Sequence, residues 1–318
     1  MYNILVLIPV DDEKKAKLEA VAKGCKVTYS DEDTVSKETV QQANIIIGSP
    51  SVEMVKGSAN LKWLHLNTAG VDQYIKEGIL AEDVMLTNST GAYGLAVSEH
   101  MFAMLLEIIK KLHIYRDNQN ERIWKSEGRV KTIYNSKVLI VGLGNIGCNF
   151  AKMVNALGGY TIGVKRRPSE KPDFIDELYL NDELDNLLPK ADIVALCLPS
   201  TKDTQKLFSK ERIALMKEGS ILLNVGRGAS VDTEALCDAV ESGHLLGAGI
   251  DVVDPEPLPE DHRLWGIKNI VMTPHVSGWY NLAETYERIF DISLDNLKRF
   301  LNGEELKNII DFNTGYVK

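Results

Sequence analysis

The sequence lacks the features that would place the protein in a membrane, in an oxidising compartment or around a metal ion. No apolar run approaches the ~20 residues that a membrane-spanning helix needs. Cysteine occurs only four times in 318 residues and never as a CxxC pair, so we expect reduced thiols and no metal site. The apolar N-terminus has no basic lead-in of the kind that begins a signal peptide. These absences predict a cytoplasmic protein.

An excess of positive charge is also missing. The chain has 36 basic and 45 acidic residues, a net charge of −9. Surfaces that bind nucleic acids or anionic membranes need a basic excess, so we expect neither partner. Hydrophobic residues make up 44% of the chain and charged residues 25%, which is typical of a globular protein with a sizeable core. A length of 318 residues predicts two domains.

Short apolar runs alternate with helical patterns along almost the whole chain, without an internal repeat. Strands are predicted at 2–9, 25–30, 44–49, 61–68, 84–88, 137–141, 160–164, 191–198, 220–225, 247–252 and 269–273. Helices are predicted at 12–23, between the second and third strands, and at 71–80, 96–116, 145–157, 182–188, 210–217, 232–242 and 282–302. Strands separated by helices indicate parallel βαβ units. We therefore predict an α/β protein with two doubly wound parallel-sheet domains, the second inserted into the first.

A glycine-rich hexapeptide, GLGNIG, follows the apolar strand that ends at 141 and opens a helical pattern. Gly142 would permit the tight turn, Gly144 would let a pyrophosphate approach the backbone, and Gly147 would let the helix pack on the strand. The helix N-terminus, at Asn145 and Ile146, would offer free N–H groups to the phosphates. An ordinary strand–helix turn is the alternative, but this context favours dinucleotide binding.

The next predicted strand, 160–164, lacks the terminal acid that usually binds the ribose hydroxyls of NAD. Lys165, Arg166 and Arg167 stand there instead. Cations at this point would attract the 2′-phosphate of NADPH, and an arginine can bind it through two hydrogen bonds. A solvated basic loop is the alternative. The missing acid and the cations together favour NADP(H) over NAD(H).

Three polar residues follow other predicted strands of the second series. Arg227 lies between two glycines, which would leave space around its guanidinium for a substrate carboxylate, although a surface ion pair is an alternative. Glu256 lies in a loop with three prolines, which would hold it rigidly. His275 shares the carboxyl edge of the sheet with the glycine turn, where open α/β sheets bind ligands. The other histidines are interpreted as structural: His65, His100, His113, His244 and His262.

The motif order GLGNIG, NVGRG, DPEPLP and TPHVSG resembles that of the D-isomer-specific 2-hydroxyacid dehydrogenase family, and the likeness covers nearly the whole chain. Residues 67–72 resemble the family's substrate-carboxylate loop, residues 90–107 its interdomain helix, and residues 199–201 its nicotinamide-side loop. Within the family, the basic residues after the second Rossmann strand and the stretch around His275 look most like glyoxylate/hydroxypyruvate reductases.

The resemblance implies a flavodoxin-like substrate domain from 1–99 and 288–318, and a Rossmann domain for NAD(P) at 100–287. It implies NAD(P)H-dependent reduction of a small 2-oxo acid to the D-2-hydroxy acid. It also implies a homodimer, formed through the helix near 97–116 and the polar arm 118–131.

The resemblance further implies a role for each site residue. Arg227 would bind the substrate carboxylate and polarise the 2-oxo group, His275 would donate the proton, and Glu256 would hydrogen-bond His275 and favour its charged form. The backbone N–H groups of Ala69, Gly70 and Val71 would hold the carboxylate, and Asp251 would lie beside the nicotinamide carboxamide. Cofactor contacts are expected at Gly142, Gly144, Asn145, Ile146, Gly147, Lys165, Arg166, Arg167, Leu198, Pro199, Thr204, Val225, Gly226, Arg227, Asp251, His275 and Gly278.

Other members of the same family are the main alternatives. A phosphoglycerate dehydrogenase often carries a further C-terminal domain, for which the chain has little length after its last predicted helix. A D-lactate dehydrogenase stays open, whereas Glu256 argues against formate dehydrogenase, which usually has Gln there. A redox-sensing corepressor of this fold would carry disordered tails, which we do not expect. Trp279 and Tyr280 either shape the pocket or pack in the core or an interface.

Overall fold

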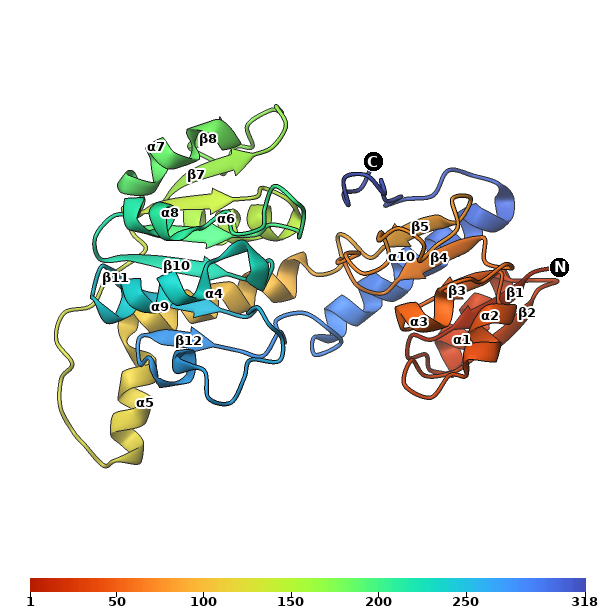
Figure 1. The fold of residues 1–318 in the computed structure, drawn as a ribbon, viewed down its shortest axis with the longest axis horizontal. Coiled ribbons are helices and arrows are strands. Elements are labelled where there is room, and N and C mark those ends of the chain that lie inside the picture. The colour runs from red at the N-terminus through yellow and green to blue at the C-terminus, as the bar shows by residue number, and fades with distance from the viewer. The chain divides into compact units, whose positions relative to one another are not determined.

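The computed structural model describes residues 1–318, and contacts between residues divide the chain into two compact units (Figure 1). The first unit comprises Met1–Tyr93 and Trp279–Lys318, and the second comprises Gly94–Gly278. The second unit is thus inserted into the first. The second unit was predicted to begin at residue 100 and begins six residues earlier, at 94. The first unit was predicted to resume at residue 288 and resumes nine residues earlier, at 279.

The first unit contains a five-stranded, all-parallel sheet in the order β2-β1-β3-β4-β5. Its strands are β1 (Asn3–Val6), β2 (Lys26–Tyr29), β3 (Ile45–Ile47), β4 (Trp63–Leu66) and β5 (Met85–Asn88). Its helices are α1 (Asp12–Val21), α2 (Lys37–Gln42), α3 (Val52–Val55) and α10 (Ala283–Asn302). This strand order is that of flavodoxin-like folds.

Local sequence explains where the helices of this unit begin and how they pack. Asp11 caps α1 by accepting a hydrogen bond from the backbone N–H of Lys14 at 2.8 Å, which satisfies one of the unpaired N–H groups of the first turn. The C-terminal helix α10 places Phe290 and Leu297 in a buried cluster with Ile4 of β1. The two ends of the chain therefore build one core.

The second unit contains a seven-stranded, all-parallel sheet in the order β12-β11-β10-β9-β6-β7-β8. Its strands are β6 (Lys137–Val141), β7 (Tyr160–Lys165), β8 (Glu177–Leu180), β9 (Ile193–Leu196), β10 (Ser220–Asn224), β11 (Leu245–Ile250) and β12 (Ile270–Met272). Its α-helices are α4 (Gly94–Lys110), α5 (Leu112–Asn120), α6 (Asn145–Ala156), α7 (Leu184–Leu187), α8 (Lys210–Leu215) and α9 (Thr233–Glu241). Short 3-10 turns lie at Asn181–Glu183, Leu188–Lys190, Gly228–Ser230 and Arg263–Gly266. The strand order reverses between β6 and β9, the switch point at which Rossmann folds bind dinucleotides.

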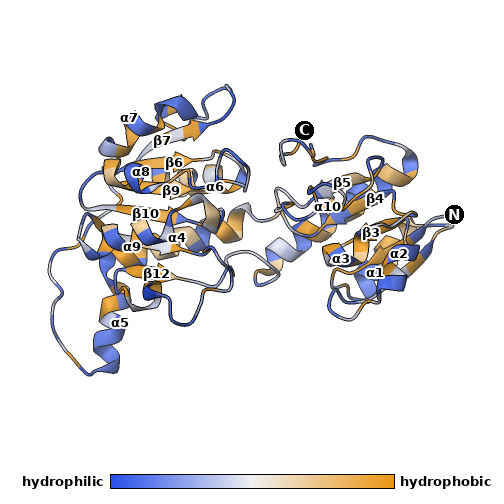
Figure 2. Ribbon diagram, viewed as in Figure 1, coloured by the Kyte–Doolittle hydropathy of each residue, from blue (hydrophilic) through white to orange (hydrophobic).

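Hydropathy follows this layering within each unit. The central strands are coloured as continuous hydrophobic runs in Figure 2, whereas helices such as α1 and α5 carry many hydrophilic residues. Strands buried on both faces need apolar side chains at successive positions, which explains runs such as Ile45–Ile47 in β3.

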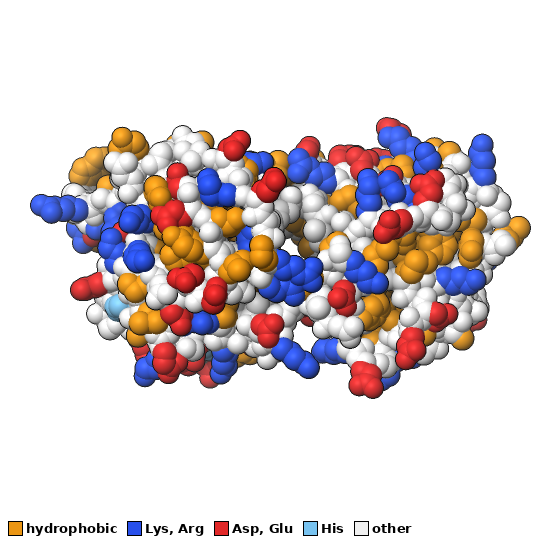
Figure 3. All heavy atoms as spheres, turned by 90° about the horizontal axis from the view of Figure 1, so that it is seen from above, with side chains coloured by type: hydrophobic (Ala, Val, Ile, Leu, Met, Phe, Trp, Pro, Cys, Tyr) orange, Lys and Arg blue, Asp and Glu red, His pale blue; other side chains and the backbone are white.

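Charges of both signs lie on the face of the molecule drawn in Figure 3. Acidic and basic side chains are interspersed on the face drawn in Figure 3, consistent with the modest net charge of −9. None of the helices combines the length and the apolar character that crossing a membrane requires.

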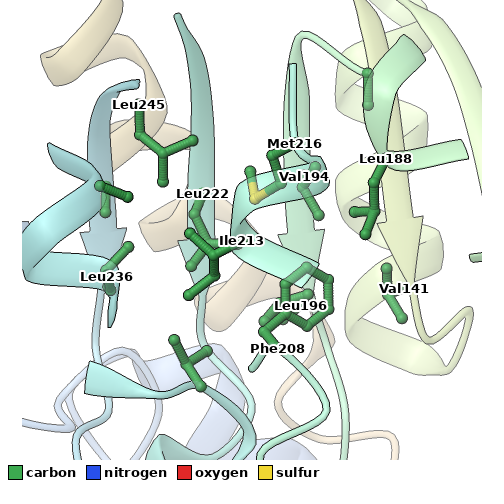
Figure 4. Packing of buried hydrophobic residues seen from close by; sticks show 14 of the residues in the cluster. Val141, Leu188, Val194, Leu196, Phe208, Ile213, Met216, Leu222, Leu236 and Leu245 are labelled. Carbon is green, nitrogen blue, oxygen red and sulfur yellow. The ribbon is translucent and has the colours of Figure 1, made fainter. Parts of the chain in front are cut away.

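One face of the second sheet is covered by α8 and α9 (Figure 4). Leu196 and Leu222 from neighbouring strands meet Ile213 of α8, Leu236 of α9 and the ring of Phe208. Each such fully buried side chain contributes about 1.5–3 kcal/mol relative to exposure. This core fixes the strand ends that carry the candidate site.

The prediction of a helix at 71–80 is wrong, because this segment forms irregular turns. Val71, Tyr74 and Ile75 have helical spacing, and the N–H groups of Tyr74 and Ile75 both bond to the carbonyl oxygen of Val71. That single turn does not continue. Gly78 adopts a φ of +77°, and the Tyr74 hydroxyl donates to the carbonyl of Pro50 instead of lying along a helix face.

The prediction of one helix at 96–116 is also wrong, because two helices, α4 and α5, occupy this stretch. Lys111 separates them with a φ of +59°, in the left-handed region, and its ammonium group donates to the carbonyl of Glu127. No glycine or proline marks this break.

The edge strand β8 was not predicted either, since its sequence ELYL is short and only partly buried.

A buried histidine in β4 fits its structural interpretation. His65 is fully buried, and its Nδ1 lies 2.7 Å from Oγ1 of Thr87, which also accepts a hydrogen bond from the indole N–H of Trp63. Nε2 lies 3.4 Å from the hydroxyl of Ser89. Burial lowers the pKa of His65 from 6.5 to about 3, so the ring is neutral in the folded protein.

The neutral state of His65 predicts a loss of stability in mild acid. The unfolded chain takes up a proton below pH 6.5, so the contribution of His65 is fully present above that pH and is lost as the pH falls towards 3. Between pH 6.5 and 5 the loss should be about 2 kcal/mol. Urea unfolding of wild type and His65→Asn at both pH values measures it. An equal acid dependence in both proteins would contradict this assignment.

Candidate active site

The candidate residues of the second unit all follow the carboxyl ends of its parallel strands. The glycine turn follows β6, Lys165 ends β7, and Arg227 follows β10. Glu256 follows β11, and His275 follows β12. Because the strands are parallel, these positions share one edge of the sheet (Figure 1).

The glycine turn has geometry suited to a pyrophosphate. Gly142 has a φ of +100°, and an added Cβ would lie 2.6 Å from the carbonyl oxygen of Cys197. A Cβ at Gly147 would lie 2.1 Å from the carbonyl oxygen of Gly142, so the helix packs tightly on the turn. A Cβ at Gly144 would meet no protein atom within 4 Å. Gly144 therefore leaves open space beside the N-terminus of α6, which has no side-chain cap, and a dinucleotide phosphate fits there.

Three cations stand at the end of β7. Lys165 is partly buried and donates a hydrogen bond to the hydroxyl of Ser169 at 2.8 Å, whereas Arg166 and Arg167 are exposed. No carboxylate occupies the corresponding positions of the chain. The end of this strand therefore presents positive charge where an NAD-specific fold presents an acid.

His275 and Glu256 form a hydrogen-bonded pair. Nδ1 of His275 lies 2.9 Å from Oε2 of Glu256, whose other oxygen accepts a hydrogen bond from the backbone N–H of Val253 at 3.2 Å. Both side chains are partly exposed, at 48% for His275 and 39% for Glu256. The pair fixes the orientation of the imidazole and leaves Nε2 for a ligand.

Asp251, which is 1% exposed, holds the backbone around His275. Its carboxylate accepts hydrogen bonds from Thr273 Oγ1 at 2.6 Å, Val276 N at 2.9 Å and Ser277 N at 3.1 Å. Its carbonyl oxygen accepts the N–H of His275 at 2.7 Å. His275 has a φ of +53°, a left-handed conformation that is costly for a non-glycine residue, and these bonds hold it there. The expected contact of Asp251 with nicotinamide stays a prediction.

Two residues that the sequence analysis did not assign to the site support this loop. The hydroxyl of Thr273 connects Asp251 to His100, whose Nε2 lies 2.9 Å from it. His100 lies on α4, far from the loop in sequence, and no local pattern points to the contact. His100 was interpreted as structural, and the structure adds that it contacts the loop that carries His275.

The glycines beside Arg227 allow a close approach of neighbouring backbones that the sequence did not predict. A Cβ at Gly226 would lie 2.5 Å from the carbonyl oxygen of Leu198, and one at Gly228 would lie 2.0 Å from the carbonyl group of Val253. These glycines therefore let three loops pack closely, and the predicted space around the guanidinium stays a prediction. Arg227 itself is partly buried and donates from Nη1 to the carbonyl of Gly226 at 2.8 Å.

Thr204 turns out to close its own loop. Its hydroxyl accepts a hydrogen bond from the N–H of Thr201 and donates to the carbonyl oxygen of Pro199, both at 2.8 Å. The hydroxyl group of Thr204 therefore already forms hydrogen bonds within its own loop. Its predicted contact with the cofactor stays a prediction.

In the first unit, the loop after β4 presents unpaired backbone donors. The N–H groups of Ala69, Gly70 and Val71 donate to no protein acceptor. The carbonyl groups of Ala69 and Gly70 are held by the side chains of Asn88 and Thr68, at 2.6 and 2.9 Å. Successive free N–H groups on a fixed loop suit an anion such as a carboxylate.

Comparison with known proteins connects this geometry to a family. Residues 102–277 match the family model described as "D-isomer specific 2-hydroxyacid dehydrogenase, NAD binding domain". A glyoxylate reductase of Thermofilum pendens is 30% identical over 260 residues, which cover 79% of this chain and 75% of that protein. A hydroxypyruvate reductase of Blautia hydrogenotrophica is 34% identical over 229 residues, which cover 69% of each chain.

A solved structure shares the whole fold. The D-isomer specific 2-hydroxyacid dehydrogenase of Xanthobacter autotrophicus Py2, in complex with NADPH and MES, superposes with a TM-score of 0.83. It is 25% identical and the match covers 99% of both chains.

Proposed function

The chain belongs to the D-isomer specific 2-hydroxyacid dehydrogenase family, and from that premise we propose that it reduces a small 2-oxo acid of the glyoxylate or hydroxypyruvate type. It is an NAD(P)-dependent oxidoreductase. The product of the proposed reaction is the D-2-hydroxy acid. The names of the two relatives, a glyoxylate reductase and a hydroxypyruvate reductase, support this substrate class. A short backbone loop with free N–H groups suits the carboxylate of such a small acid.

The observation that carries the proposal is the hydrogen bond between His275 and Glu256. With Nδ1 bonded to the carboxylate, a protonated His275 presents its other proton at Nε2 and can give it to the 2-oxo oxygen. Glu256 stabilises the charged ring and keeps its orientation. Arg227 binds the carboxylate of the substrate and polarises the 2-oxo group.

The cofactor fits the glycine turn through Gly142, Gly144 and Gly147, with its pyrophosphate at the N-terminus of α6. When bound, NAD(P)H supplies the hydride that reduces the carbonyl carbon. We propose that the second unit holds the cofactor and the first unit recognises the substrate carboxylate through the free N–H groups of Ala69, Gly70 and Val71. The preference for NADP(H) rests on Lys165 and its two neighbouring arginines.

The test is NADPH oxidation by the wild-type enzyme with a panel of 2-oxo acids. Glyoxylate and hydroxypyruvate should be turned over with the highest kcat/KM. Preference for pyruvate would favour a D-lactate dehydrogenase, and preference for a phosphorylated acid would favour a phosphoglycerate dehydrogenase. No oxidation with any member of the panel would contradict the proposal.

We also propose a homodimer. The segment after α5 carries Trp124, fully exposed, and Tyr134, 64% exposed, without a core of its own. A large exposed aromatic side chain on an irregular arm is typical of a partner-binding segment, and C2 dimers are the commonest soluble oligomers. We also propose a cytoplasmic location, which the four free thiols favour.

Replacing Trp124 with serine should weaken the dimer roughly 10-fold or more, because buried tryptophans are frequent binding hot spots. Light scattering over a dilution series of both proteins measures the effect. Trp265→Ser is the matched control, since Trp265 is also exposed but lies outside the arm. A wild-type monomer at micromolar concentration would contradict the dimer.

A further inference from the structure

Four side chains from separate segments meet at the carboxyl edge of the first sheet. Glu32 follows β2, Ser49 follows β3, and Asn67 follows β4 directly. Tyr280 comes from the segment that leads into α10. We call these four residues the Glu32 cluster. It adjoins the loop with the free N–H groups, because only one residue separates Asn67 from Ala69.

Hydrogen bonds fix the cluster. Oε1 of Glu32 accepts the backbone N–H of Ser49 at 2.7 Å, and the hydroxyl of Ser49 donates to Oδ1 of Asn67. Nδ2 of Asn67 donates to the hydroxyl oxygen of Tyr280 at 2.7 Å. Asn67 is 2% exposed, and its carbonyl oxygen accepts the hydroxyl of Tyr93. The side chains are therefore positioned before any ligand arrives.

The cluster retains unused hydrogen-bonding capacity and an uncompensated charge. The hydroxyl proton of Tyr280 has no acceptor in the protein. No lysine, arginine or histidine forms an ion pair with Glu32, and burial raises the pKa of its carboxyl group although the backbone N–H of Ser49 donates a hydrogen bond to it. A half-buried carboxylate beside a free hydroxyl donor can take a ligand group that both donates and accepts a hydrogen bond.

We propose that the Glu32 cluster binds the substituent on carbon 3 of the substrate and selects a hydroxyl group over an anionic group. This inference rests on the proposed function. The Tyr280 hydroxyl would donate a hydrogen bond to the oxygen of the substrate's hydroxyl group, and the Glu32 carboxylate would accept a hydrogen bond from that hydroxyl group. A phosphate or a second carboxylate would instead meet the negative charge of Glu32.

The chain geometry supports this assignment. Two residues of extended chain reach at most about 7 Å, so Asn67, which bonds to Ser49 and Tyr280, lies within the scale of a three-carbon acid from Ala69. Like charges brought together in a partly desolvated site disfavour binding strongly, by ~10-fold or more. A purely structural role, in which Glu32 only holds the loop at Ser49, would change overall activity or stability but not the choice between substrates.

The experiment measures kcat/KM of the full-length enzyme with NADPH for glyoxylate, hydroxypyruvate and oxaloacetate. Glyoxylate has no carbon 3, so each protein's own glyoxylate value normalises the other two. In wild type, hydroxypyruvate should exceed oxaloacetate by ~10-fold or more. Glu32→Gln keeps the acceptor and removes the charge, and should raise the oxaloacetate-to-hydroxypyruvate ratio about 10-fold.

Two further variants complete the test. Asp33→Asn removes the same charge from the next, exposed residue and should leave the ratio unchanged. Tyr280→Phe removes only a hydroxyl group and should lower the normalised hydroxypyruvate value about 10-fold, which keeps the proposal testable if Glu32→Gln fails to fold. The inference is wrong if glyoxylate is reduced but Glu32→Gln leaves the oxaloacetate-to-hydroxypyruvate ratio unchanged and Tyr280→Phe leaves the normalised hydroxypyruvate value unchanged. It is also wrong if Asp33→Asn changes the oxaloacetate-to-hydroxypyruvate ratio as much as Glu32→Gln does. If wild type reduces none of the three acids, the proposed function itself fails and takes this inference with it.

Discussion

Replacing His275 with alanine should lower kcat for every 2-oxo acid that the enzyme reduces by ~10²–10⁴-fold, the usual contribution of a positioned general acid. The cause is the loss of the proton that Nε2 supplies while Nδ1 is bonded to Glu256 at 2.9 Å. Glu256→Gln should have a smaller effect, because the amide oxygen can still accept a hydrogen bond from the Nδ1–H group but carries no negative charge beside the ring. Steady-state kinetics with saturating NADPH measure both variants.

His262→Ala is the matched control for this substitution. Nε2 of His262 lies 3.2 Å from a carboxylate oxygen of Glu234 in the same unit, so it is a second histidine–glutamate pair. His262 lies outside the loop that Asp251 holds. The kcat of the His262→Ala enzyme should therefore stay within about 2-fold of wild type. Near-wild-type kcat in His275→Ala would remove His275 from the proton-donor role, and an equal loss in His262→Ala would show that folding, and not chemistry, is being measured.

The cofactor preference should be the second large effect. Wild type should have a kcat/KM for NADPH roughly 10- to 150-fold above that for NADH, since one charge-assisted hydrogen bond contributes about 1.5–3 kcal/mol. Arg166 and Arg167 are exposed, so solvent screening should place the ratio toward the lower end and reduce it as salt rises. Arg166 is the first choice for the phosphate contact because its planar guanidinium can form two hydrogen bonds.

The double variant Lys165→Asp/Arg166→Ala should abolish the preference for NADPH or reverse it in favour of NADH. An aspartate at the end of β7 restores the acid that binds ribose hydroxyls and repels a 2′-phosphate. Lys210→Ala, which removes a cation from α8 in the same unit, should leave the ratio unchanged. A wild-type preference for NADH, or a double variant with the wild-type ratio, would mean that these cations form only a solvated surface.

Local pattern was enough to predict the features that depend on a few adjacent residues. The strand at 137–141 and the start of α6 agree with prediction because an apolar strand, a glycine turn and a helix start succeed one another within one short stretch. The alternation of strands and helices likewise predicted two parallel sheets, which the fold confirms. The hydrogen bond between Glu256 and His275 followed from the family resemblance and not from spacing.

Features that depend on distant contacts were missed or misread. The break at Lys111 has no glycine or proline to mark it, and the contact of its ammonium group with Glu127 lies outside any local window. The close approach of the Leu198 and Val253 backbones to the glycines beside Arg227 was not predicted, because these residues are distant in sequence. The Glu32 cluster draws on four segments between residues 32 and 280, which only the folded chain brings together.

Chiral analysis of the product formed from hydroxypyruvate tests directly whether this chain reduces a 2-oxo acid stereospecifically with a nicotinamide cofactor. Wild-type enzyme, NADPH and hydroxypyruvate are incubated, and the glycerate is quantified by enantiomer against NADPH consumed. We expect one molecule of D-glycerate for each NADPH oxidised. Formation of L-glycerate, or consumption of NADPH without glycerate, would contradict it.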